Sequence, residues 1–172
     1  MTDVAPGGPR ITGTLRDEGG RGVVRVEDVY DTDAADLWQA LTRPQRLERW
    51  LARVEGDLEV GGEFHILFTS GWEGPGRVDV CDEPHRLAVT TGRGSDETVV
   101  EAVLTPEGTK TRLVIEERGV GLGELAAHGA GWQVHTEDLA AHLAGREPSD
   151  WLTGQQALAP AYRAMEVARV EG

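Results

Sequence analysis

The stretch RLAVTTGRGSDETVVEAVLTPEGTKTRLVIEER, residues 86–118, decides the fold of this chain. It contains three runs in which apolar and polar side chains alternate, as they do in β-strands with one buried face. The turn-forming segments Gly92 to Asp96 and Pro106-Glu107-Gly108 separate the runs. Because short turns join them, we expect neighbouring strands to be antiparallel. The predicted strands cover residues 86–92, 97–105 and 110–118.

Three more runs of the same kind precede this stretch, with glycine or proline turns between them, at residues 53–59, 63–69 and 76–82. Together the six runs predict an antiparallel meander. The alternation places one apolar set on a common face, which must be covered. This set comprises Phe64, Ile66, Phe68, Val78, Val80, Leu87, Val89, Val100, Ala102, Leu104, Leu113 and Ile115.

The segment from about 122 to 144 is the predicted cover, because its apolar and aromatic residues recur every three or four positions. We expect one long helix that packs on the sheet. The residues on its packed face are Leu125, His128, Trp132, His135, Leu139 and Leu143.

The sequence before the meander predicts one strand and two short helices. Val24, Val26 and Tyr30 alternate from residue 23 onward, which indicates a half-buried strand. Asp33 is a predicted helix cap, and this helix is expected to end near Thr42. A capping box that begins at Thr42 itself is expected to open the second helix.

The chain is expected to form one domain with an extension at each end. Residues 1–22 are rich in glycine and proline, so we expect an N-terminal arm with one possible extra strand and with residues 1 to about 10 poorly ordered. Residues 23–145 form the predicted domain. Residues 146–172 form a predicted helical appendix, with a helix near 158–169, which should pack on the domain or complete a homodimer.

The composition excludes several classes of partner. The chain has 172 residues and a net charge of −13, which repels the phosphates of nucleic acids and anionic membrane surfaces. No apolar stretch is long enough to span a bilayer, and the first residues do not resemble a signal peptide, so a cytoplasmic location is expected. The single cysteine, Cys81, excludes an internal disulfide, and alternation with Val78 and Val80 is expected to turn it away from the covered face of the sheet.

Five separated motifs carry a resemblance to a known family. The motifs are Leu37-Trp38-Gln39-Ala40-Leu41-Thr42-Arg43-Pro44 with Leu47 and Trp50, Gly61-Gly62-Glu63-Phe64, Glu83-Pro84-His85-Arg86-Leu87, Thr111-Arg112-Leu113 and Gly129 to Trp132. With these motifs the chain resembles the SRPBCC superfamily, also called START-like, in the branch similar to the C-terminal domain of the activator of the heat-shock chaperone ATPase. The resemblance implies an α+β helix-grip fold, in which an antiparallel sheet of about seven strands wraps a long C-terminal helix and encloses a cavity, with two short helices after the first strand.

Residues on the covered face, together with an aromatic residue in a glycine-rich turn, are the candidate ligand-binding set. Most are apolar, and the carboxylate and imidazoles among them are the expected polar anchors. No catalytic residue is assigned. The set is Phe64, Ile66, Phe68, Trp72, Val78, Leu87, Glu117, His128, Trp132, His135 and Leu139.

The polar members of this set also have structural interpretations. His128 could simply be paired with Glu124, four residues earlier on the same helix. Glu117 could lie near Asp28, because the first and last strands are neighbours in the helix-grip plan, and such a pair would raise one carboxyl pKa. Alternatively, nearby arginines could neutralise both carboxylates.

We expect no metal ion and no cofactor. His128, His135 and His142 are seven residues apart, so successive members lie about 10 Å apart along a helix, too far to share one ion. The run Gly121-Leu122-Gly123-Glu124-Leu125-Ala126 matches a dinucleotide-binding fingerprint, but no second parallel strand is predicted after it.

Three functions remain open. The first is binding or carriage of a small hydrophobic molecule in an internal cavity. The second is a cavity enzyme of the cyclase, aromatase or hydrolase type that works by acid/base chemistry. The third is a chaperone-regulating or other protein-binding module. The scaffold hosts all three, so the residues of the site must discriminate between them.

Overall fold

The six strands predicted between residues 53 and 118 are present in one nine-stranded sheet of the computed structural model, which describes residues 9–170. The sheet order is β3-β4-β5-β6-β7-β8-β2-β1-β9. Every neighbouring pair is antiparallel except β1 with β9. The strands are β1 Gly13–Glu18, β2 Arg21–Tyr30, β3 Ala52–Gly56, β4 Glu63–Phe68, β5 Glu73–Asp82, β6 Arg86–Thr91, β7 Thr98–Glu107, β8 Lys110–Val120 and β9 Ala168–Val170.

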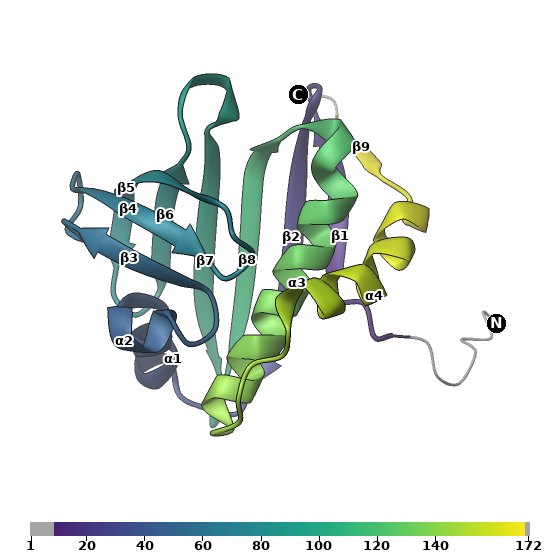
Figure 1. Cartoon of the computed structure of the whole chain (residues 1–172). Helices are drawn as coiled ribbons and strands as arrows, with labels where there is room; N and C mark the ends of the chain where they lie inside the picture. The colour runs from purple at the N-terminus through teal and green to yellow at the C-terminus, as the bar shows by residue number, and fades with distance from the viewer. Residues whose placement is uncertain (1–8, 171–172) are drawn as a thin grey trace.

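The long helix lies across one half of this sheet, as predicted. In Figure 1, α3 crosses in front of β8 and β2, and it contacts β2 and β1. The predicted α+β helix-grip fold is therefore confirmed, with two strands more than expected. The helices are α1 Ala34–Thr42, α2 Pro44–Leu47, α3 Leu125–Leu143 and α4 Trp151–Ala164, with single 3-10 turns η1 Gly94–Asp96 and η2 Leu122–Glu124.

The segment before residue 23 supplies a strand of the sheet. β1 pairs with β2 through a tight turn at Gly19 and Gly20, both of which have a positive φ that favours glycine. Leu15 of β1 is buried in the core. Most of the arm that we expected to be poorly ordered, residues 1–8, lies outside the described residues.

The two short helices are present, but their caps differ from the prediction. Asp33 caps α1, accepting a hydrogen bond from the backbone N of Asp36. Thr42 does not cap α2, because its hydroxyl donates to the carbonyl oxygen of Trp38 at 2.7 Å, one turn back. Arg43 occupies the cap position of α2 without a side-chain hydrogen bond.

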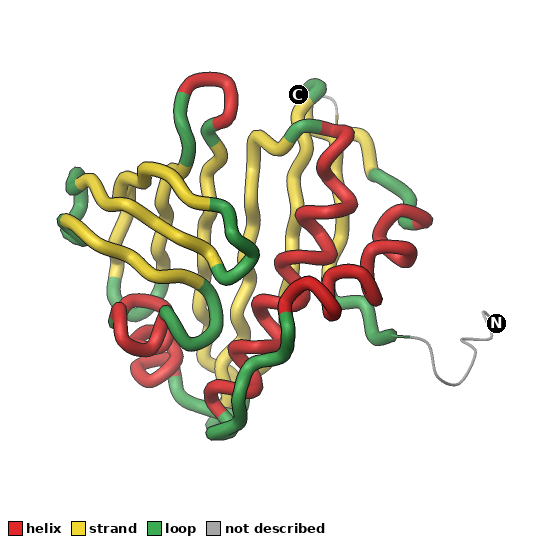
Figure 2. Tube along the Cα trace, in the orientation of Figure 1, coloured by secondary structure: helices red, strands yellow, loops and turns green. Residues whose placement is uncertain are grey.

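The last helix begins seven residues before its predicted start near 158 and ends at Ala164. Asp150 caps its first turn by accepting from the backbone N of Thr153 at 3.2 Å. Figure 2 shows this helix, α4, lying alongside α3 on the side away from β3 to β6. At the contact, the Tyr162 hydroxyl donates to Gln133 Oε1 of α3 at 2.6 Å.

Candidate functional site

Two adjacent pockets lie on the covered face of the sheet, one beside α1, α2 and Trp132 of α3 and the other beside α3 and α4. The smaller, which we call the inner pocket, has a volume of about 320 Å³, and the larger, the outer pocket, about 970 Å³. Phe68, Thr91 and Trp132 line both, so the two pockets meet at these three side chains.

The inner pocket is apolar. Its lining contains one charged residue, Glu83, among leucine, valine, isoleucine and aromatic side chains. Trp38 and Trp50, which anchor the short helices in the core, form part of its wall. A surface of this kind favours an apolar occupant, because burying apolar area is worth about 25 cal/mol per Å².

Cys81 lines the inner pocket, which corrects the prediction that it faces away. The pairing of β5 with β6 shifts between Val78 and Val80, so one extra residue interrupts the alternation. Beyond this bulge Cys81 lies opposite Leu87, which also lines the pocket, and Val80 lies opposite Ala88 instead.

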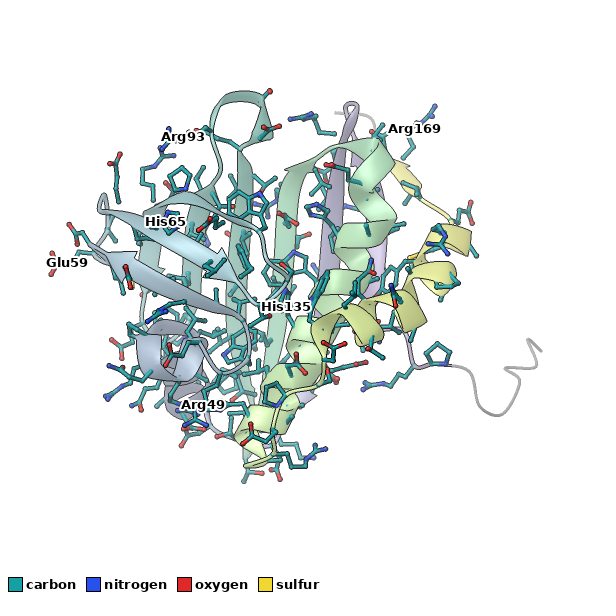
Figure 3. The ribbon with its side chains drawn as sticks, in the orientation of Figure 1. Arg49, Glu59, His65, Arg93, His135 and Arg169 are labelled. Atoms are coloured by element: carbon teal, nitrogen blue, oxygen red, sulfur yellow. The ribbon has the colours of Figure 1, made fainter. Side chains whose placement is uncertain are left out.

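The outer pocket is more polar and is built from several parts of the chain. It lies between the β4–β5 turn, the segment after β6, the starts of β2 and β7, the end of β8, the first part of α3, and α4. Figure 3 shows His135 near the centre of the molecule, and His65 and Arg93 nearer the end from which α3 starts. All three residues line this pocket.

Glu117 is the buried carboxylate of the outer pocket, with 7% of its surface exposed. It points inward because it continues the alternation of Leu113 and Ile115 along β8. Its Oε1 accepts from Trp132 Nε1 at 3.0 Å and lies 2.7 Å from His128 Nδ1. Its Oε2 accepts from the Thr98 hydroxyl at 2.8 Å.

These contacts keep Glu117 ionised despite its burial. Burial alone would raise the pKa of this carboxyl group, but the hydrogen bonds and the charge of His128 outweigh it, and the pKa lies below its ordinary value. The hydrogen bond to Glu117 raises the pKa of His128 against the opposing effect of burial. Because an ionised carboxylate only accepts, His128 Nδ1 is the donor of this pair.

His135 is the buried imidazole of the outer pocket, with 5% of its surface exposed. Its Nδ1 lies 3.4 Å from the Thr69 hydroxyl, and the rings of Phe68, Trp132 and Trp151 surround it at centroid distances of 5.6 to 6.0 Å. Burial lowers the pKa of His135 to about 4, so the ring is neutral near pH 7. It acts as an aromatic wall with one polar edge.

Asp28 and Glu117 are not a pair. On the paired strands β2 and β8, Val24 lies opposite Glu117, whereas Asp28 lies opposite Leu113, four residues farther along. Asp28 instead binds Arg10, whose guanidinium donates to it at 2.9 and 3.0 Å.

The structure brings ten of the eleven candidate residues to the two pockets. Leu139 is the exception, because it is completely buried in the hydrophobic core and lines neither pocket. Phe64, Ile66, Val78 and Leu87 line the inner pocket, Phe68 and Trp132 line both, and Trp72, Glu117, His128 and His135 line the outer pocket.

Sequence reasoning missed several residues of the outer pocket. Thr98 was recoverable, because it precedes Val100 and Ala102 in the same alternation along β7. Arg21 is the first residue of β2, and Arg93 lies in the segment after β6. The fold brings both to the outer pocket. Trp151 and Gln155 come from α4, and no local pattern shows where a separate helix docks.

No group of three or more metal-binding side chains occurs within residues 9–170. Over the same residues, no helix is long and apolar enough to cross a membrane.

A family model described as Activator of Hsp90 ATPase homolog 1-like protein matches residues 31–144. The match covers α1 to α3 and includes Glu117, His128, Trp132 and His135, whereas α4 lies beyond its end. No curated protein is significantly similar to this chain.

Several solved structures share the fold. The crystal structure of CalU16 from Micromonospora echinospora has a TM-score of 0.72 at 23% identity, covering 91% of this chain and 96% of its own. MLL2253 from Mesorhizobium loti has a TM-score of 0.66 at 26% identity, with 72% and 97% covered. DynU16, a protein in the dynemicin biosynthetic locus, has a TM-score of 0.67 at 26% identity, with 74% and 50% covered.

Proposed function

Because the chain belongs to the Activator of Hsp90 ATPase homolog 1-like family of the SRPBCC superfamily, we propose that it binds a small, largely apolar organic molecule between its sheet and α3. The apolar part of the ligand would occupy the inner pocket. Its polar part would reach the outer pocket and meet His128.

The observation that carries this proposal is the composition of the inner pocket. A volume of about 320 Å³ lined almost entirely by apolar side chains has the size and character of a small-molecule site. Burial of a few hundred Å² of ligand surface at about 25 cal/mol per Å² is enough for micromolar affinity.

The relationship to DynU16 supports the class of ligand. That protein belongs to a biosynthetic locus and is 26% identical to this chain. A biosynthesised organic compound is therefore the first class to screen.

The test is a ligand screen with a variant that fills the inner pocket. Fatty acids, sterols and aromatic polyketides would be screened by native mass spectrometry and by thermal shift. Val89 of β6 lines the inner pocket, so Val89→Trp should occupy its volume and abolish binding. Val103 of β7 alternates with the pocket-lining Ala102, so Val103→Trp on the opposite face is the matched control and should bind normally.

The screen has three informative outcomes. Binding that Val89→Trp removes and Val103→Trp preserves supports the proposal. Binding that neither variant affects contradicts it, because the ligand would then lie elsewhere. If no compound binds, the proposal fails and the protein-binding alternative is tested next, by association with a purified chaperone middle domain.

A further inference from the structure

The contacts of Glu117 fix the orientation of His128. The carboxylate lies on β8 and the imidazole on α3, and Nδ1 of the ring is committed to Glu117 at 2.7 Å. The ring also lines the outer pocket, and 38% of the side chain is exposed. Because Nδ1 donates to Glu117, Nε2 is the nitrogen without a hydrogen-bond partner within residues 9–170, and it carries a lone pair whenever the ring is neutral.

Glu117 is itself held rigidly. Trp132 Nε1 and the Thr98 hydroxyl donate to its two oxygens, so rotation of the carboxylate would break both hydrogen bonds. A carboxylate that orients an imidazole in this way also stabilises the imidazolium that forms when Nε2 takes a proton. A histidine that only closes the core would have no need of an exposed ring edge.

Two guanidinium groups line the same pocket and are available for negative charge. Arg21 Nη2 donates to the Ser95 carbonyl oxygen at 2.7 Å, which positions the side chain at the mouth. Neither Arg21 nor Arg93 forms an ion pair with a carboxylate within residues 9–170. The carboxylates Glu73, Asp96, Glu117 and Glu124 line the same pocket, and the two arginines are the cationic groups beside them that can face a developing anion.

We propose that the outer pocket is a proton-transfer site, in which His128 Nε2 removes a proton from the carbon next to the carbonyl group of a compact, apolar ketone. This inference rests on the proposed binding of such a molecule. Glu117 is the positioning residue, and Arg21 stabilises the enolate oxygen.

The step balances without any further reactant. The lone pair of Nε2 forms the new N–H bond, the C–H bonding pair becomes the C=C bond of the enolate, and the carbonyl π pair moves to oxygen. Nε2 then returns a proton to carbon. In D₂O the Nε2–H exchanges with solvent before the return, so carbon gains a deuteron and the reaction is visible as exchange.

The test uses 2-tetralone, a bicyclic and enolisable ketone, as the probe. Its deuterium uptake in D₂O is followed by NMR for the wild type and for His128→Gln, whose amide can still donate to Glu117. Exchange should be saturable in the wild type and at least about 100-fold slower in His128→Gln. His85→Gln, at an exposed turn outside both pockets, is the control and should exchange at the wild-type rate.

A pH profile separates this role from a purely structural one. The charged groups that act on His128 are Glu117 on β8 and Glu124 on the turn before α3. The other charged residues that line the same pocket are Arg21, Arg93, Glu73 and Asp96. The wild-type rate should rise with pH as His128 loses its proton. In Glu117→Gln the rise should occur at lower pH, because the carboxylate that raises the pKa of His128 is gone.

The outcomes distinguish the two proposals. Saturable binding of 2-tetralone with equal exchange in the wild type and His128→Gln overturns the proton-transfer site and leaves the binding function standing. No saturable binding of 2-tetralone overturns the proton-transfer proposal for such a ketone, and the binding function is then decided by the ligand screen. Nitrogen-15 NMR of the wild type supplies a test that needs no variant, since a proton on Nε2 of His128 at high pH would overturn the assignment.

Discussion

The indole of Trp151 lies against the imidazole of His135, with ring centroids 5.8 Å apart and planes inclined at 31°. His135 belongs to the region that matches the family model, and Trp151 belongs to α4, which lies beyond it. Gly131 makes this approach possible, because a Cβ at that position would lie 3.0 Å from the Trp151 ring. The contact makes α4 a wall of the outer pocket.

Trp151→Ala should lower the free energy of unfolding by about 1–3 kcal/mol, because it removes a half-buried aromatic ring from the α3–α4 contact. Trp151→Phe should cost less, since Trp151 Nε1 is buried without a hydrogen-bond partner in residues 9–170. Urea unfolding measures both. Leu152→Ala, at an exposed neighbour, should change stability by less than about 0.5 kcal/mol; an equal loss there would contradict the assigned contact.

Acidification should destabilise the fold through His135. Burial lowers its pKa from 6.5 to about 4, so between these values the unfolded chain binds a proton that the folded chain does not. The contribution of His135 to the free energy of unfolding has its full value above about pH 6.5. It falls as the pH drops towards 4, by at most about 1.4 kcal/mol per pH unit.

The measurement compares the free energy of unfolding at pH 7 and pH 5 in the wild type and in His135→Phe. The variant isolates the effect of His135, because His128 also titrates. Its raised pKa makes acidification increase its contribution to the free energy of unfolding. His135→Phe should lose less stability on acidification than the wild type. An identical loss in the two proteins would show that His135 is not buried in its neutral form.

Gly129→Ala should destabilise the protein although alanine is the better helix former. A Cβ at Gly129 would lie 2.6 Å from the Tyr162 ring and 3.0 Å from Leu15, so the ring must move. The steric cost of about 1–3 kcal/mol exceeds the gain in helix propensity of about 1 kcal/mol. Thermal unfolding should show a lower Tm for Gly129→Ala and little change for Gly123→Ala, where no atom lies within 4 Å.

Truncation after Arg146 should impair the domain, because α4 covers part of α3 and β1. The removed segment includes Leu158 and Tyr162, both buried, and the hydrogen bond from Tyr162 to the fully buried Gln133. The shortened chain should unfold at lower urea concentration and bind more of a dye that reports exposed apolar surface. An equally stable chain without dye binding would contradict the packing of α4.

The sequence alone determined most of the sheet and the helix that covers it. The alternation of Leu113, Ile115 and Glu117 placed the carboxylate on the inner face, and the spacing of His128, Trp132 and His135 placed these rings on one helix face. Such periods are local properties of a chain, because a strand repeats every two residues and a helix every 3.6.

Tertiary structure alone decided which of these residues meet. The hydrogen bonds from His128 and Trp132 to Glu117 depend on how α3 crosses β8, and the expected partner Asp28 lies elsewhere along the neighbouring strand. The bulge in β5 turned the Cys81 side chain to the pocket face of the sheet, because one unpaired residue changes the face of every residue after it. The position of Trp151 on His135 required the docking of a separate helix, which depends on shape and not on any local repeat.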